Sequence, residues 1–240
     1  MVVHTAFQKE GKIMLPEKAS WNIGTVMAVH VLRIVTGLLL AQTVYPFWSG
    51  DSAFWIELVD RITVLFLVWL VLVKSRVAWT EIGLSLNHAG RNGLWGLLAG
   101  VGLLTVSIYS EKYYAAWLLL TPAQHPLAVQ AQAAASWQQL LSPLFLAGVA
   151  APVAEEALYR LLTFLPLRER WGVWGGTIGS AAIFTLMHFS VYWLGEMMVI
   201  GIGLALLYYW TGSLVSAIVA HAFVNASKIL LLFFGVLPVT

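Results

Sequence analysis

Long apolar runs constrain this chain more than any other feature of its sequence. A bilayer core of about 30 Å takes roughly 20 residues of helix to cross, and apolar runs of that length recur along most of the chain. Hydrophobic residues make up 60% of the sequence, charged residues only 10%, and the mean hydropathy is +0.83. These values lie outside the range of soluble globular domains. The sequence therefore predicts an all-α, polytopic transmembrane helical bundle.

Seven spanning helices are predicted, and an eighth is expected at most in part. The seven cover residues 22–47, 55–73, 92–110, 139–164, 174–192, 195–210 and 213–235. The partial helix would lie at 113–120, which is apolar but too short to span alone. Residues 121–139 are rich in Pro, Ala and Gln and predict a loop with an interfacial helix, and 78–91 is too polar to cross.

Two regions follow from this reading, a polar amino-terminal tail (1–20) and a single integral membrane domain (21–240). No small-residue cleavage site follows the first apolar run, so a removable signal peptide is not expected. Lys and Arg concentrate on one side of the predicted bundle, at residues 9, 12, 18, 74, 76, 91, 168 and 170. Because positively charged loops stay cytoplasmic, the amino terminus is predicted to be cytoplasmic, in a multi-pass protein of the cell membrane.

Charge and cysteine content exclude several functions. The formal net charge is only +2, and the charges cluster between the apolar runs. Without a basic face, nucleic acid is not an expected partner. The chain has no cysteine, which excludes thiol catalysis, disulfides and thiolate metal sites. Membrane lipids are the expected surroundings, and no residue pattern specifies an oligomeric state.

Three predicted helices carry ionisable or amide side chains where a membrane helix is normally apolar. Such residues cost free energy in lipid, so they face a cavity or one another and indicate a functional site. In the fourth helix, Glu156 and Arg160 stand four apart on one face and can pair, whereas Glu155 points about 100° away. His188 follows in the fifth helix. In the seventh, a histidine and an asparagine, His221 and Asn225, stand one turn apart.

Helical rise places three of these side chains in one layer. At about 1.5 Å per residue, Glu155, His221 and His188 lie roughly 15, 12 and 17 Å from the predicted cytoplasmic ends of their helices. Unrelated polar residues have no reason to share a depth, so the sequence predicts one site built from three helices.

The motifs resemble those of a known family. EEALYR fits E-E-x-x-x-R, FTLMH fits F-x-x-x-H and HAFVN fits H-x-x-x-N, in that order and on successive spanning segments. This combination is similar to the CAAX prenyl endopeptidase and bacteriocin-processing family (CPBP, Abi-type) of intramembrane proteases. The resemblance covers roughly residues 140–232, the expected catalytic core; the amino-terminal half shares only generic hydrophobic helix.

The resemblance implies an endopeptidase that acts on a membrane-associated peptide or protein, and it assigns roles to the motif residues. Glu155 would be the general base for a water, and His188 would position that water. His221 and Asn225 would polarise the scissile carbonyl and stabilise its oxyanion. Peptide hydrolysis without a Ser or Cys nucleophile needs these functions, an activated water and donors aimed at the developing charge.

Glu156 and Arg160 would hold the geometry of the site. A buried ion pair that only fixes helix register explains them as well. No cofactor is expected to be required, although two histidines and a glutamate could ligate zinc, so a zinc-dependent version of the protease stays open. A metal bound by Glu155 would need another base, and Glu156, the one nearby candidate, is expected to be paired with Arg160.

Other polar residues are given structural interpretations. A non-catalytic scaffold or transporter with a buried polar site is the alternative from another class. His30 and Arg33 lack a motif and are expected near a helix end or lining water. Lys228 is expected to snorkel outward. His4, His88 and His125 are placed in loops or tails without chemistry.

Overall fold

The described chain is almost wholly helical. The computed structural model describes residues 8–9, 12–13, 15–16, 18–48, 52–85, 88–121, 123 and 125–237. His4 and Asp51 lie outside these residues. The helices are α1 (Ile23–Thr43), α2 (Ser52–Ser75), α3 (Ala89–Trp117), α4 (Pro126–Ala133), α5 (Trp137–Phe145), α6 (Ala151–Glu156), α7 (Leu165–Leu186), α8 (Leu194–Thr211) and α9 (Leu214–Phe233). A 3-10 turn, η1 (Tyr45–Phe47), follows α1, and β1 (Gln8–Lys9) pairs antiparallel with β2 (Lys12–Ile13).

The expected membrane bundle is confirmed, with changes at the ends of several helices. Within the described residues, five helical segments are long and apolar enough to cross a membrane: 23–47, 89–117, 137–186, 194–211 and 214–233. The 50-residue segment is two legs, because Gly172 (φ 72°) breaks it. Helix α2 is also long, but it carries Glu57, Asp60, Arg61 and Lys74. Each of the seven predicted spans thus contains a helix in the structure.

Three boundary predictions were wrong. Residues 113–117 prolong α3 instead of starting a separate eighth helix. The fourth predicted helix does not end at residue 164 but continues to the kink at Gly172. The fifth ends at Leu186, because Phe189 adopts a left-handed backbone (φ 50°), so His188 lies in the turn beyond the helix. The helix expected within 121–139 is present as α4.

The helix that carries the first motif is continuous but irregular. Two π-helical stretches, η2 (Leu146–Ala150) and η3 (Ala157–Phe164), flank α6. Proline lacks the N–H that would close a helical hydrogen bond, and Pro166 therefore cannot donate to the carbonyl of Leu162. The indole of Trp21 donates to that carbonyl instead, at 2.8 Å. The chain segment before α1 is thereby attached to the motif helix.

Close backbone approach holds α3 against α9. Gly96 and Gly100 form a G-x-x-x-G spacing on α3. A Cβ on Gly96 would lie 2.7 Å from the Ser216 carbonyl oxygen, and one on Gly100 would lie 3.0 Å from Phe223. Small residues at such spacing let membrane helices pack backbone to backbone.

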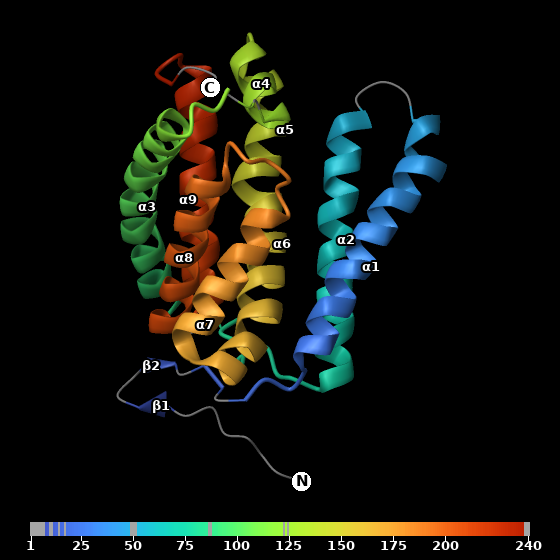
Figure 1. Cartoon of the computed structure of the whole chain (residues 1–240), viewed down its shortest axis with the longest axis vertical. Coiled ribbons are helices and arrows are strands. Elements are labelled where there is room, and N and C mark those ends of the chain that lie inside the picture. Colours follow the sequence, from blue (N-terminus) through green and yellow to red (C-terminus); the bar gives the residue numbers. More distant parts are fainter. Residues whose placement is uncertain are drawn as a thin grey trace.

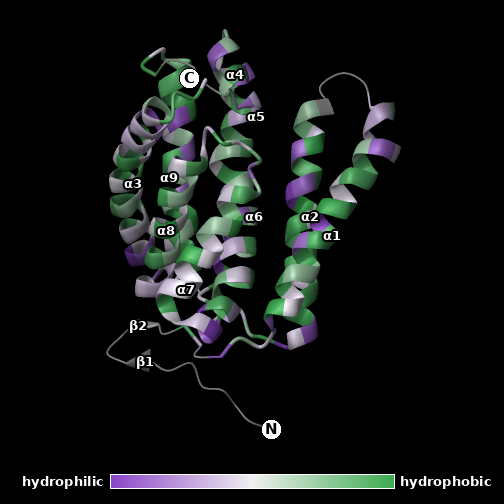
Figure 2. Ribbon diagram, in the orientation of Figure 1, coloured by the Kyte–Doolittle hydropathy of each residue, from purple (hydrophilic) through white to green (hydrophobic). Residues whose placement is uncertain are grey.

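The helices stand roughly side by side, with the amino-terminal segment at one end of the bundle and the carboxyl terminus at the other (Figure 1). Helices α1 and α2 form a pair along one flank, and α2 contacts the motif helix through η2, α6 and η3. Apolar residues dominate the ribbons. Hydrophilic positions gather at helix ends, and also in the first half of α2 and the second half of α9, which lie on the side of the bundle where the chain ends (Figure 2). We refer below to the amino-terminal end and the carboxyl-terminal end of the bundle.

Candidate active site

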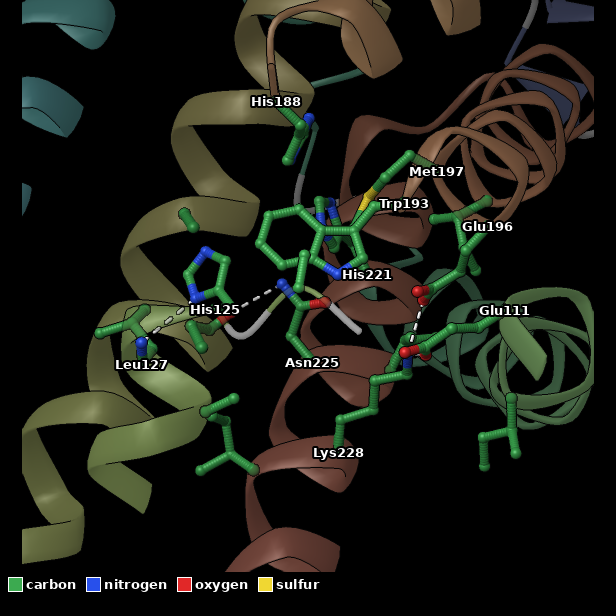
Figure 3. Close-up of a pocket in the computed structure, with 18 of the residues that line it drawn as sticks. Glu111, His125, Leu127, His188, Trp193, Glu196, Met197, His221, Asn225 and Lys228 are labelled. Atoms are coloured by element: carbon green, nitrogen blue, oxygen red, sulfur yellow. Dashed lines mark hydrogen bonds and ion pairs between the residues drawn. The ribbon is translucent and has the colours of Figure 1, made fainter. Parts of the chain in front are cut away.

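A cavity of about 620 Å³ lies within the bundle. We call it the central cavity. Its walls come from α2, α3, α4, the motif helix, the α7–α8 turn, α8 and α9. Four of the six predicted site residues line it: Glu155, His188, His221 and Asn225. The close-up shows His188, His221 and Asn225 around this space, with Asn225 and Lys228 following His221 along α9 (Figure 3).

The two adjacent glutamates face different surroundings, as the helical spacing predicts. The side chain of Glu155 is 15% exposed and lines the cavity, whereas Glu156 and Arg160 are fully buried and do not line it. Glu156 Oε2 lies 3.1 Å from Arg160 Nε. One carboxylate is therefore available to a molecule in the cavity, and the other is neutralised behind the cavity wall.

Glu156 also orients His221. Its Oε1 atom lies 2.8 Å from His221 Nδ1. Because a carboxylate only accepts hydrogen bonds, Nδ1 carries a proton. The other ring nitrogen, Nε2, points to the cavity side, 3.8 Å from Glu155 Oε2. The histidine thus stands between the two glutamates with its tautomer set by the buried one, an arrangement that fixes the direction in which Nε2 can exchange a proton.

His188 is fixed in the same manner by the backbone. Its Nδ1 lies 2.8 Å from the Phe184 carbonyl oxygen. A carbonyl oxygen only accepts hydrogen bonds, so Nδ1 carries the proton and donates it. Nε2 is left to face the cavity. Helix α7 ends at Leu186, and the backbone N–H of His188 bonds the Thr185 carbonyl. The Phe184 carbonyl therefore lacks its regular helical donor and can accept from the His188 ring.

Proline also explains the position of Asn225. In the π-helical stretch, Ala151 N–H bonds five residues back to Leu146, and the next such bond would run from residue 152 to Ala147. Residue 152 is proline and has no N–H. The Asn225 amide supplies the missing donor to the Ala147 carbonyl at 3.1 Å. This leaves one of its two N–H groups, and its oxygen, for the cavity.

Phe184, the first residue of the second motif, packs among the polar groups. Its ring centroid lies 4.7 Å from that of His188 and 6.1 Å from that of His221. The Arg160 guanidinium lies 5.0 Å from the same centroid. The terminal nitrogens of Arg160 have no hydrogen-bond partner among the described residues, and this cation–π contact compensates part of their burial. Phe184 therefore connects the buried ion pair to the cavity wall.

Several polar residues of the cavity were missed from the sequence. Lys228 does not snorkel outward: it lines the cavity and bonds Glu196 at 2.6 Å and Glu111 at 3.0 Å. Seven residues make almost two helical turns, so the spacing from His221 to Lys228 already places both on one face. Glu111 was missed because the predicted helix ended at residue 110.

His125 was assigned no chemistry and instead lines the central cavity. Its Nδ1 accepts from Leu127 N–H at 3.2 Å and caps α4, and its ring lies 5.4 Å from that of Trp193. Burial, followed by nearby His188 and Arg61, lowers the pKa of His125 below 6.5, although Glu155 opposes this shift. The helix-capping spacing His125-Pro126 was the available signal.

His30 and Arg33 belong to the helix interface and not to the cavity. His30 is 3% exposed, and its Nε2 lies 3.1 Å from Thr163 Oγ1. Arg33 donates to the Tyr159 hydroxyl at 3.0 Å and pairs with Asp60. These contacts attach α1 and α2 to the motif helix. The sequence-based expectation of a helix end or a water-lined position was therefore wrong for His30, which is buried within α1.

The donors do not form a metal site as they stand. Among the described residues, no three His, Asp or Glu side chains are grouped closely enough to hold one metal ion. His221 and Glu155 come within 3.8 Å of each other, but the His221 Nδ1 atom is committed to Glu156.

Fold and site together define an integral membrane helical protein with a polar cavity between its spans. Residues 137–227 match the family described as type II CAAX prenyl endopeptidase Rce1-like, and this segment of the chain is therefore similar to a CAAX-protease domain. The match confirms the family that the three motifs predict, and it contains all six predicted site residues. It supports intramembrane endopeptidase activity of the CAAX type in general. Neither a curated protein nor a solved structure matches the chain.

Proposed function

We propose that this protein is an intramembrane endopeptidase in which Glu155 activates a water to hydrolyse a peptide bond in a membrane-associated peptide or protein. One observation carries the proposal. Side chains from three separate motifs converge on one cavity, and of the two adjacent glutamates only Glu155 reaches it. We extend to this chain the peptide-bond hydrolysis of the family, and leave open the prenylated substrate in the family's description.

In the proposed reaction, Glu155 takes a proton from water while the water oxygen attacks the scissile carbonyl carbon. His188 Nε2 accepts a hydrogen bond from the second O–H of the water, which keeps its proton, and so orients the nucleophile. The carbonyl oxygen becomes an oxyanion, stabilised by the remaining Asn225 N–H and, when protonated on both nitrogens, by His221 Nε2–H. As the C–N bond breaks, Glu155 returns its proton to the departing amine, so the step balances with water as the one co-reactant.

Glu156 and Arg160 are proposed as positioning residues. They do not line the cavity, and they act through His221, whose Nδ1 proton Glu156 accepts. A carboxylate behind a catalytic histidine fixes its tautomer and orientation. The structural interpretation, an ion pair that fixes helix register, is compatible with this role, since the same contacts serve both.

The test is a comparison of Glu155→Gln with wild type in cells, followed by mass spectrometry of membrane peptides. Products that depend on the protein should disappear with Glu155→Gln and persist with Glu81→Gln, a matched change in a turn at the amino-terminal end of the bundle. In water enriched in the heavy oxygen isotope, purified wild type should incorporate one label into the new carboxyl group. Persistence of the products with Glu155→Gln would reject the assignment.

We propose that the reaction requires no metal, because the described residues around Glu155 do not offer three ligands to one ion. The zinc-dependent version makes a different prediction. It requires that a chelator abolish cleavage and that zinc alone restore it. Metal-free hydrolysis requires that cleavage by the reconstituted protein be unchanged by the chelator.

The scaffold or transporter alternative is decided by the same peptide comparison. It predicts that Glu155→Gln alters ligand binding or transport while wild type and variant yield the same membrane peptides. The proposed setting is the cell membrane with the amino terminus cytoplasmic, supported by the distribution of Lys and Arg. The proposed partners are membrane lipids and the peptide or protein substrate.

A further inference from the structure

The central cavity extends from the catalytic groups toward one end of the bundle only. Its outer walls are Ile108, Glu111, Lys112 and Ala115 near the end of α3, Ala123, His125, Leu127 and Ala128 before and within α4, Tyr192 and Trp193 in the α7–α8 turn, and Leu232 and Leu237 at or just beyond the end of α9. These segments lie in the half of the bundle that contains the carboxyl terminus, with the α7–α8 turn deeper in the bundle than the ends of α3 and α9 (Figure 1). Among them Lys112 is exposed. This is where the cavity opens.

The amino-terminal end contributes no wall. None of the described residues in 15–30, 74–91, 165–173 or 208–216 lines the cavity. These segments instead close that end with buried contacts, such as the Trp21 bond to Leu162 and the Tyr208 hydroxyl bond to the Ile82 carbonyl at 2.9 Å. Glu155 and His221 therefore lie at the bottom of a cavity that is sealed on the amino-terminal side.

Charged groups line the path from the opening to the catalytic groups. Lys228 bridges Glu111 and Glu196 across α3, α8 and α9, and all three line the cavity (Figure 3). Ionised side chains at membrane depth face water or one another. Lys228 is seven residues from His221, about 10.5 Å along α9. The cluster thus provides a polar lining between the opening and the site.

The charges at the two ends of the bundle indicate which face of the membrane each occupies. The sequence of the segments at the amino-terminal end contains eight Lys and Arg residues, Lys9, Lys12, Lys18, Lys74, Arg76, Arg91, Arg168 and Arg170, and four acidic residues, Glu10, Glu17, Glu81 and Glu169. In the carboxyl-terminal half of the described bundle, the acidic residues Glu57, Asp60, Glu111 and Glu196 stand against four basic ones, Arg33, Arg61, Lys112 and Lys228. The basic end is the cytoplasmic one by the positive-inside rule.

We infer that the central cavity is hydrated from the non-cytoplasmic face, and that the hydrolytic water and the peptide substrate both enter from that face. The substrate class is then a peptide or protein segment exposed outside the cytoplasm, and a cytosolic carboxy-terminal tail does not reach Glu155. The substrate part rests on the proposed function; the hydrated opening does not.

The absence of cysteine makes a direct test available, because any introduced thiol is the only one in the chain. The probe is a membrane-impermeant sulfonated maleimide, added to right-side-out and to inverted vesicles from a bacterial host. Ile108→Cys reports on the cavity, and Val106→Cys, two residues away and exposed on the outer surface of α3, is its matched control. Ala133→Cys and Ala78→Cys mark the two ends of the bundle.

Right-side-out vesicles should label Ile108→Cys and Ala133→Cys, and only inverted vesicles should label Ala78→Cys. Because a thiol must ionise in water to react, Ile108→Cys should react at least about tenfold faster than Val106→Cys. Labelling of Ile108→Cys from the same face as Ala78→Cys would overturn the inference, as would equal rates for Ile108→Cys and Val106→Cys. Ala115→Cys, a small change in the same wall, replaces Ile108→Cys if that variant fails to fold.

The route of the substrate is tested in the same vesicles. Modification of Ile108→Cys from the non-cytoplasmic face should reduce the protein-dependent peptide products at least about tenfold, since the adduct narrows the path to Glu155. Unchanged products after complete modification would overturn the substrate route. If Glu155→Gln stays active while the labelling pattern is as expected, the proposed catalysis fails and the hydrated opening stands.

Discussion

Replacing each of the two adjacent glutamates by glutamine should separate catalysis from folding. Among the described residues, Glu155 has its polar contact with His221, at 3.8 Å, and it faces the cavity. Glu156 is fully buried between His221 at 2.8 Å and Arg160 at 3.1 Å. A glutamine at 156 can keep its oxygen toward only one of these partners, so it places a donor against the other and leaves the Arg160 charge without its carboxylate.

The structure sets the size of the two effects. Removing one partner of a buried ion pair costs about 3–5 kcal/mol, so Glu156→Gln should lose that much stability. For a protein of this length, this corresponds to a fall in Tm of roughly 6–20 °C. Cleavage should also fall by on the order of 10⁴, because His221 loses the acceptor that fixes its tautomer. Glu155→Gln should abolish cleavage while its stability stays within about 1 kcal/mol of wild type.

Intrinsic fluorescence from the twelve tryptophans gives the Tm of each purified variant in detergent, and peptide products give the activity. Glu81→Gln is the control for the amide substitution itself. A Glu156→Gln protein as stable as Glu155→Gln would refute the placement of Glu156 in the buried pair. An active Glu155→Gln protein would refute its role as the base.

Three further predictions concern residues outside the motifs. Lys228→Met leaves two carboxylates without the ammonium that bridges them and should cost about 3–5 kcal/mol, whereas Lys74→Met on the exposed end of α2 should be neutral in the same melting assay. Trp21→Phe leaves the Leu162 carbonyl without a donor and should cost about 1–3 kcal/mol; a Tm equal to wild type would contradict this. Burial, then nearby positive groups, lowers the pKa of His125 in the folded protein. Its contribution to the free energy of unfolding is therefore fully present above pH 6.5, and it is lost as the pH falls through the lowered pKa. Wild type should therefore lose more Tm than His125→Gln between pH 7 and pH 5, and parallel curves would show that His125 does not titrate there.

The predictions that succeeded rest on helical periodicity. Spacing alone separates Glu155 from Glu156 and pairs the latter with Arg160, because residues four apart share a face and adjacent ones do not. The errors occurred where tertiary contacts override that periodicity. A left-handed residue ends α7 before His188, and prolongation of α3 brings Glu111 to Lys228.

Missing backbone donors show the same division between local sequence and tertiary structure. Pro152 and Pro166 are plain in the sequence, and each must leave a carbonyl without its helical partner. Which distant side chain supplies the donor was not predictable, because Asn225 lies 78 residues from Ala147 and Trp21 lies 141 residues from Leu162. The commitment of one Asn225 N–H to the backbone changes what that residue can offer a substrate.

The sequence by itself determined that the chain is a membrane bundle, that it carries the three motifs of a CAAX protease, and that one of two adjacent glutamates is free, because hydropathy and helical spacing are local properties. Only the tertiary structure decided that His125, Glu111, Glu196 and Lys228 share the cavity with the motif residues, and that no described residue at the amino-terminal end of the bundle lines it. Those features depend on the packing of helices that are distant in sequence, and no local pattern encodes which of their residues line the central cavity.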